Sequence, residues 1–357
     1  MRTWLLTGAV VAMLAGGATA AWASVTEFPI CQAAGPQFGP AICGDLVVWS
    51  DLRDYDAGQV IRGYNLKTKS EFAICPAKAA FACGAKLALT PTAVIWQDKR
   101  NGNWDIYGYN LTTKQEFPIC TAPGDQVAPV AYGDYVVWAD ARNATTSGWD
   151  IYGLNLKTKQ ALAICTQPKE QTQAAIQGDR VVWVDGRNNG YDLYGYDLAA
   201  QTEFLVPTAA CAKETPSIYG DVVVWSYESA GSSGWDVHGY NLKTNQAFPI
   251  STKGCAQHHP VIWKNIVVYL GNGAYDYGAG TQDVWGYDLL TQQDFLICHT
   301  MHFKYDPGIW GNVVVWQGYG AGQDNPDISG ARLAGGATPQ IVSPLIKRPV
   351  QLMYPPH

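Results

Sequence analysis

The chain has 357 residues, of which 15% are charged and 12% are aromatic, and its formal net charge is −6. Because there is no basic excess, the composition excludes a surface built to bind nucleic acid. The many turn-forming residues, 37 Gly and 20 Pro, together with the aromatic residues favour an all-β protein with many short strands.

The first 23 residues have the pattern of a secretory signal peptide. Arg2 supplies a positive start, an apolar run covers residues 4–15, and Ala21-Trp22-Ala23 fits the small-x-small cleavage pattern. The alternative is an uncleaved anchor, but the run is short for a membrane span. We therefore expect a secreted, periplasmic or cell-surface protein with no membrane span after cleavage.

A Val-Val-Trp-like run recurs through most of the chain. We call its last residue the landmark residue of each copy. The seven landmark residues are Trp49, Trp96, Trp138, Trp183, Trp225, Tyr269 and Trp316. Their spacing of 42 to 47 residues is typical of four-stranded propeller blades. The sequence thus predicts a seven-bladed β-propeller of antiparallel blades over residues 24–343.

The third copy shows the four strands expected in each blade, which we call strands a to d. They cover residues 127–132, 135–139, 150–156 and 161–165, separated by tight turns or polar loops. Strand b is apolar on both faces, which indicates a strand covered on both sides, as between neighbouring blades. A Gly in strand c, such as Gly108, is expected to admit a large ring from the neighbouring blade.

The two ends of the chain bear on how the ring closes. Residues 27–31 repeat the sequence of residues 116–120, which form a strand d. We expect this N-terminal strand to complete the last blade. In the alternative, residues 340–342 form that strand d and the N-terminal strand is an extra edge. Residues 344–357 are predicted to form a Pro-rich tail over the surface.

The repeat resembles that of the TolB-like propeller family. The resemblance is carried by Val-Val-Trp-x-Asp-x-Arg-Asn followed by Asp-Ile-Tyr-x-Tyr-Asn-Leu, best matched at residues 96–111, 138–156 and 183–198. It extends more loosely over residues 26–343. Such propellers serve as interaction platforms, carbohydrate-associated modules and occasionally enzymes, so the resemblance implies a fold more than a function.

Propeller topology puts the b–c loops and the d–a connections on one face, which we call the loop-rich face. The b–c loops of the first four copies begin with Asp-x-Arg. These pairs are Asp51 and Arg53, Asp98 and Arg100, Asp140 and Arg142, and Asp185 and Arg187. Their carboxylates suit Ca²⁺ or acid–base chemistry. Because the motif repeats around the ring, the favoured interpretation is that Arg bridges carboxylates and pins each loop to its blade.

The last three copies depart from this pattern, and the departures suggest a ligand site on the loop-rich face. Aromatic and polar residues gather there, and their rings suit stacking on a sugar or a peptide. The candidate ligand-binding residues are Tyr227, Glu228, Trp235, His258, Tyr275, Tyr277 and Tyr319.

A group of histidines and one carboxylate lies in the same copies. Alignment on the landmark residues makes Asp306 equivalent to His259, and both are expected near the mouth of the central channel on the loop-rich face. With His258 and His302 they are candidate ligands of a transition metal. His259, His302 and Asp306 are also the candidate catalytic residues, acting as acid or base.

The nine cysteines indicate an oxidising compartment, and their odd number leaves at least one unpaired within the chain. Most lie near strand d ends and d–a loops, so disulfides within or between blades are expected. Cys75 with Cys83 is one candidate pair. There is no Cys-x-x-Cys motif, which argues against a redox site.

Three functions remain open on these grounds. The favoured one is a non-catalytic binding scaffold for a protein or a glycan, held on the loop-rich face around the last three copies. The second is a polysaccharide-degrading enzyme, a lyase or hydrolase, using the histidine and aspartate candidates. The third is a structural surface or matrix protein. The sequence has no Gly-x-Ser-x-Gly elbow, phosphate-binding loop or His-Glu-x-x-His motif.

Overall fold

The computed structural model describes residues 24–53, 59–75, 86–188, 190–208, 212–228, 234–252, 256–271, 282–300, 302–319 and 325–334. The predicted signal peptide and Pro-rich tail lie outside these ranges. Every regular element in the described ranges is a strand. No helix long and apolar enough to span a membrane occurs in these ranges.

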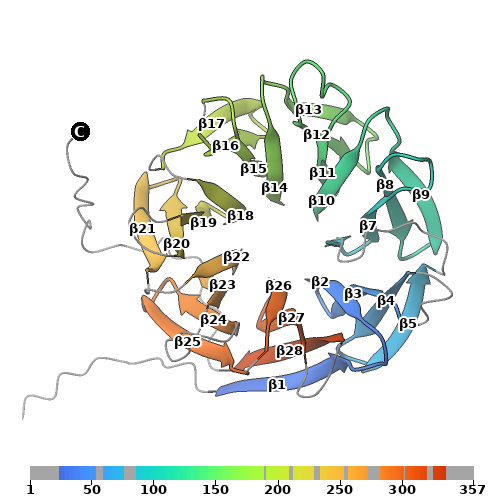
Figure 1. Cartoon of the computed structure of the whole chain (residues 1–357), viewed down its shortest axis with the longest axis vertical. Helices are drawn as coiled ribbons and strands as arrows, with labels where there is room; N and C mark the ends of the chain where they lie inside the picture. Colours follow the sequence, from blue (N-terminus) through green and yellow to red (C-terminus); the bar gives the residue numbers. More distant parts are fainter. Residues whose placement is uncertain are drawn as a thin grey trace, which may run out of the picture.

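Seven four-stranded antiparallel sheets surround a central axis, as predicted (Figure 1). Blades 1 to 3 consist of β2 (Gln37–Cys43), β3 (Leu46–Asp51), β4 (Val60–Asn65) and β5 (Ser70–Cys75); β6 (Ala88–Leu89), β7 (Ala93–Asp98), β8 (Asp105–Asn110) and β9 (Gln115–Cys120); and β10 (Gln126–Tyr132), β11 (Tyr135–Asp140), β12 (Asp150–Asn155) and β13 (Ala161–Cys165). Blades 4 and 5 consist of β14 (Gln171–Gln177), β15 (Arg180–Asp185), β16 (Asp192–Asp197) and β17 (Thr202–Val206); and β18 (Lys213–Tyr219), β19 (Val222–Glu228), β20 (Trp235–Asn241) and β21 (Gln246–Ser251). Blades 6 and 7 consist of β22 (Gln257–Trp263), β23 (Ile266–Gly271), β24 (Asp283–Asp288) and β25 (Gln293–Cys298); and β26 (Lys304–Trp310), β27 (Val313–Tyr319), β28 (Pro326–Ala334) and β1 (Ser24–Cys31).

The N-terminal strand closes the ring. β1 pairs antiparallel with β28, from Ser24 opposite Ala334 to Pro29 opposite Ser329, and so supplies the outermost strand of blade 7 (Figure 1). This confirms the expected closure. The alternative strand, residues 340–342, lies outside the described residues.

The core lies between blades. In blade 4, Val182 packs in a cluster with Val223 of blade 5, whereas Trp183 packs in a cluster with Val137 of blade 3. Strand b of each blade is therefore covered on both faces, as its apolar pattern predicted. Each such side chain contributes roughly 1.5–3 kcal/mol by leaving water.

The glycine of strand c has a different partner from the one expected. A Cβ placed on Gly195 would lie 2.2 Å from Cζ of Phe204. Gly195 and Phe204 are directly opposite each other in β16 and β17 of the same blade. The prediction of a ring from the neighbouring blade is therefore wrong, because the register places the ring of the outermost strand over the glycine.

The Asp-x-Arg motif holds the ring together, as the favoured interpretation predicted. In blade 3, the buried carboxylate of Asp140 accepts hydrogen bonds from Nε1 of Trp138 (2.8 Å) and from the backbone N–H of Arg142 (2.9 Å). The Arg142 guanidinium donates to the same carboxylate (2.6 Å) and to Sγ of Cys120 (3.3 Å) in the preceding blade. One motif thus joins a loop to its own blade and to its neighbour.

The cysteines whose side chains are described are free thiols. They are Cys31, Cys43, Cys120, Cys165 and Cys298. The disulfide prediction is wrong for these five. Three of them, Cys31, Cys120 and Cys165, instead accept a hydrogen bond from an Arg guanidinium of the next blade. Burial raises the pKa of the Cys31 thiol to about 11, so it stays protonated at neutral pH. The candidate pair Cys75 and Cys83 lies outside the described side chains.

Candidate binding site at the channel mouth

The innermost strand of each blade carries a bulge close to its start. In β10 the register shifts between Val127 and Val130, and the same shift occurs in five other innermost strands. At each bulge one residue has a positive φ: Gly39 (57°), Ala128 (51°), Gln173 (53°), Thr215 (50°), His259 (54°) and Asp306 (48°). Such angles are strained for most residues, and a bulge redirects the side chain of the residue that adopts them.

These bulge residues have the same place in every repeat, ten positions before the landmark residue. Lys86, just before β6, holds this place in blade 2. We call the seven residues the mouth ring: Gly39, Lys86, Ala128, Gln173, Thr215, His259 and Asp306. The backbone is nearly constant here whereas the side chain differs in every blade. The mouth ring therefore places seven different side chains around one opening on a similar backbone.

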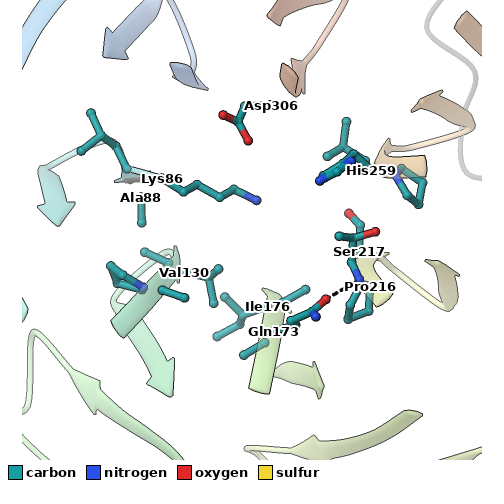
Figure 2. A pocket seen from close by; sticks show the side chains of 18 of the residues that line it. Lys86, Ala88, Val130, Gln173, Ile176, Pro216, Ser217, His259 and Asp306 are labelled. Carbon is teal, nitrogen blue, oxygen red and sulfur yellow. Dashed lines mark hydrogen bonds between the residues drawn. The ribbon is translucent and has the colours of Figure 1, made fainter. Parts of the chain in front are cut away.

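A cavity of about 560 Å³ occupies the centre of the propeller (Figure 2). Six members of the mouth ring line it, all except Gly39, and below them the wall is built from small residues two positions further along the strands. We call these the wall ring: Ala88, Val130, Ala175, Ser217 and Val261. A chamber of this size suits a small ligand or one end of a larger one.

A ring of larger side chains follows the chamber toward the turn-rich face, six positions before each landmark residue. These residues are Cys43, Thr90, Tyr132, Gln177, Tyr219, Trp263 and Trp310. The ring of Trp263 packs at a tilt against Trp310 (ring centroids 4.1 Å apart) and against Tyr219 (5.1 Å). Gln177 donates to the Tyr132 hydroxyl (3.4 Å). All seven are buried or half-buried, and the cavity lining ends one residue earlier, at Leu89, Ala131 and Ile176. We call this ring the floor.

Two opposite charges and one imidazole face the chamber from the mouth ring. Figure 2 shows the Lys86 ammonium and the Asp306 carboxylate extending into the cavity from different blades, with His259 on a third. Burial raises the pKa of Asp306, and the Lys86 charge partly offsets this. Burial also lowers the pKa of His259, and Lys86 lowers it further. Lys86 thus acts on both Asp306 and His259, although burial is the larger cause of each shift.

His259 is connected to a second histidine and a glutamine. Its Nδ1 lies 2.7 Å from Nδ1 of His258, and Nε2 of His258 lies 2.7 Å from the Gln282 side-chain amide. Burial, reinforced by the neighbouring His259, lowers the pKa of His258 to about 4. The pair is thus neutral at pH 7. One proton shared between the two Nδ1 atoms fixes the orientation of His259 in the mouth.

The predicted metal and catalytic group does not assemble. His259 and Asp306 line the chamber where the alignment placed them. His302 does not line it; its backbone carbonyl accepts a hydrogen bond from Nζ of Lys304 (2.8 Å) in the d–a connection. Within the described ranges no three His, Cys, Asp or Glu side chains form a group that could hold a metal ion. Of the proposed set of His258, His259, His302 and Asp306, only His259 and Asp306 line the chamber, so the metal site stays a prediction from the sequence.

The predicted ligand-binding residues of blade 5 have separate roles. Tyr227 packs edge-on against His238 (4.4 Å between centroids) and donates to Asp236 (3.3 Å), so it supports its own blade. Glu228 is exposed and lies opposite Trp235 at the end of the β19–β20 hairpin. Tyr275 and Tyr277 lie outside the described residues.

An exposed aromatic strip on blade 7 escaped the sequence analysis. Phe303 and Tyr305 are 42% and 38% exposed and stack with an interplanar angle of 20°. Burial and the nearby Tyr319 hydroxyl raise the pKa of Tyr305, so predicted residue Tyr319 belongs to the same group. We call Phe303, Tyr305 and Tyr319 the aromatic strip. The sequence could have identified Tyr305 as a candidate, because it immediately precedes the mouth-ring residue Asp306.

Some departures of the late blades have a structural cause. In blade 3, buried Gln126 begins β10 and donates to the loop carbonyl of Gly124 (3.0 Å). In blade 7, buried Lys304 takes this place and donates to the carbonyls of His302 and Gln282. A Cβ on Gly318 would lie 3.0 Å from Cδ of Lys304. Gly318 stands where blades 1 to 4 have the aspartate of Asp-x-Arg, and the missing side chain leaves room for Lys304.

Comparisons with known proteins support the fold. No family model matches this chain, and no curated protein sequence matches it. Among solved structures, the β-propeller domain of the Trilobed protease from Pyrococcus furiosus, described as having an open velcro topology, matches with a TM-score of 0.66 at 12% identity, over 83% of this chain and 94% of that chain. Oligogalacturonate lyase from Vibrio parahaemolyticus matches with a TM-score of 0.60 at 11% identity, over 87% and 96%. TolB from Acinetobacter baumannii matches with a TM-score of 0.47 at 15% identity, over 64% of this chain and 57% of that chain. The first two likenesses, at 11 to 12% identity, establish that this chain has the β-propeller fold.

Proposed function

We propose that the protein is a secreted or periplasmic binding propeller that takes a polypeptide ligand at its channel mouth, on the loop-rich face. The observation that carries this proposal is the central chamber, lined by a mouth ring whose residue type differs in every blade. Loops and bulges held by a rigid scaffold are where binding residues concentrate.

Two neighbouring features add contact area for such a ligand. The exposed rings of Phe303 and Tyr305 stack on each other, and Tyr305 immediately precedes the mouth-ring residue Asp306 in β26. Aromatic side chains of this kind dominate binding energy at protein interfaces. A segment that places one part in the chamber and another on the aromatic strip uses both.

The chamber wall favours a polypeptide over a glycan. Ala88, Val130, Ala175 and Val261 supply small apolar surface, and Ser217 is the one hydroxyl in the wall ring. Sugar hydroxyls placed against such a wall would lose their hydrogen bonds to water, which is costly. An apolar side chain gains by the same burial.

The described side chains give less support to the competing catalytic function. General acid–base chemistry needs side chains converging within hydrogen-bond reach of one reacting atom. Of the candidate residues, His259 and Asp306 share the chamber, but His302 belongs to the d–a connection. A chamber with an imidazole, a carboxylate and an ammonium of different blades is well suited to recognition.

The test is a selection from a displayed peptide library, run in parallel with a glycan array. The wild-type protein should retain peptides, and Val130→Trp, which fills the chamber, should retain them at least ten-fold less well. Lys157→Ala, on an exposed turn of the opposite face, serves as the matched control and should behave as wild type. Glycan binding that is lost in Val130→Trp, with no peptide retained, would overturn the choice of a polypeptide.

A further inference from the structure

The mouth of the chamber carries a cation and an anion that do not neutralise each other. Lys86 of blade 2 and Asp306 of blade 7 both line the cavity. Across the described part of the chain, neither side chain makes a hydrogen bond or an ion pair within 4.0 Å. Both are directed into the cavity in Figure 2. A ligand with two opposite charges would satisfy both without displacing a protein partner.

The groups beside these charges are neutral. Gln173 is fixed by the hydrogen bond that its Oε1 accepts from the backbone N–H of Thr215 (2.6 Å), and His259 is oriented by His258. Glu214 is the one further charged residue in the lining, and it precedes Thr215 on blade 5. The charge pattern of the mouth is thus one ammonium facing two carboxylates, with neutral hydrogen-bonding groups between them.

The chamber below the mouth is apolar and ends at the floor. The wall ring is built mainly from Ala and Val, and beyond it Trp263 packs against both Trp310 and Tyr219. A short molecule with an apolar body and charged ends fits this arrangement.

We propose that the ligand is a short linear peptide with apolar side chains and two free ends, whose α-ammonium binds Asp306 and whose α-carboxylate binds Lys86. The apolar side chains fill the wall ring. This inference rests on the proposed function and specifies its ligand class. Opposite charges placed at both ends of a ligand also select against capped, extended or internal peptide segments.

The experiment measures affinity by calorimetry for four forms of one tripeptide, Ala-Val-Leu. The forms have free ends, an acetylated N-terminus, an amidated C-terminus, or both caps. Each cap should weaken binding to the wild-type protein about ten-fold or more, because each removes one charge-assisted hydrogen bond. Val130→Trp should bind none of the four.

Two substitutions assign the ends. Asp306→Asn should bind the free and acetylated forms equally while still preferring a free carboxylate. Asparagine is chosen because it tolerates the positive φ of this position. Lys86→Met should bind the free and amidated forms equally while still preferring a free amine. Thermal unfolding of each variant checks that the fold is retained.

The outcomes separate this inference from the proposed function. Equal affinity of all four forms for the wild-type protein, with binding lost in Val130→Trp, overturns recognition of the ends and leaves the binding function standing. No tripeptide binding, alongside chamber-dependent retention of longer displayed peptides, overturns the inference in the same way. A library selection that yields no chamber-dependent peptide, together with no binding of any of the four tripeptide forms to the wild-type protein, overturns the proposed function itself.

Discussion

At the residue scale, the Asp-x-Arg motif depends on buried aspartates that each accept several hydrogen bonds. Asp140 accepts from an indole, a backbone amide and a guanidinium while having no exposed surface. In blade 1, burial would raise the pKa of Asp51, but the hydrogen bonds from Arg53 and Trp49 outweigh it and lower that pKa below its usual value. Such groups stabilise the fold only as complete sets.

Asp140→Ala should therefore be strongly destabilising. It leaves the Trp138 indole N–H and the Arg142 guanidinium without their acceptor, and breaking a buried pair on one side costs about 3–5 kcal/mol. Chemical denaturation measures the loss. Asp134→Ala, at the exposed β10–β11 turn, should change stability by about 0.5 kcal/mol or less. Equal effects of the two substitutions would show that the motif is not a structural clip.

Histidine burial should make stability depend on pH. Burial lowers the pKa of His238 from 6.5 to about 4. Because its folded pKa is depressed, protons favour the unfolded chain, so stability is full above pH 6.5 and falls as the pH is lowered toward 4. His238→Phe, which keeps a ring against Tyr227, should flatten this part of the profile. Urea unfolding at several pH values measures it, and parallel profiles for both proteins would contradict the assignment.

At the element scale, every blade except blade 3 pairs a glycine in strand c with a phenylalanine ring in its outermost strand. Gly195 with Phe204, Gly239 with Phe248 and Gly286 with Phe295 leave less than 2.5 Å between the ring and a would-be Cβ. The ring covers backbone that a glycine leaves bare. This explains why the two residue types recur together in the repeats.

Gly195→Ala should cost about 1–3 kcal/mol, because the added methyl group forces Phe204 out of its place. Adding Phe204→Ala should make the glycine substitution nearly neutral, so that the two changes are strongly non-additive. Gly190→Ala is the control, since a Cβ there meets nothing within 4 Å. Thermal unfolding of the four variants measures the coupling. Simple additivity would mean that the ring is not held by the glycine.

The strands themselves were predictable because the apolar core residues of each repeat form a short continuous run in the sequence. The four strands expected at residues 127–165 match β10 to β13 within two residues at each end. The mouth ring was only partly predictable. A bulge leaves no residue type in common, so Lys86 and Gln173 carry no signal beyond their distance from the landmark residue. His302 was misplaced because it lies in a connection, where alignment of strands gives no position.

At the scale of the whole molecule, ring closure depends on a strand from the far end of the sequence. β1 covers β28 and places Ile30 and Cys31 in the cluster between blades 7 and 1. A ring closed in this way keeps the channel width constant, which a chamber of fixed shape requires. Without β1, the hydrogen-bonding edge of β28 would be open to other chains.

A chain that begins at residue 32 should therefore unfold at a lower temperature than one that begins at Ser24, and it should associate at high concentration. The first effect follows from the lost burial of Ile30 and Cys31 and the second from the open edge. Calorimetry and size-exclusion chromatography measure both. An unchanged midpoint and a monomeric profile would show that closure does not depend on β1.

The central claim is that a ligand binds in the chamber at the channel mouth, and amide hydrogen exchange with a peptide taken from the library selection tests it most directly. Binding should protect the innermost strands β10, β14, β22 and β26 and leave the outermost strands β5, β9 and β13 unchanged. Protection confined to the outermost strands or to the turn-rich face, with the innermost strands unaffected, would contradict it.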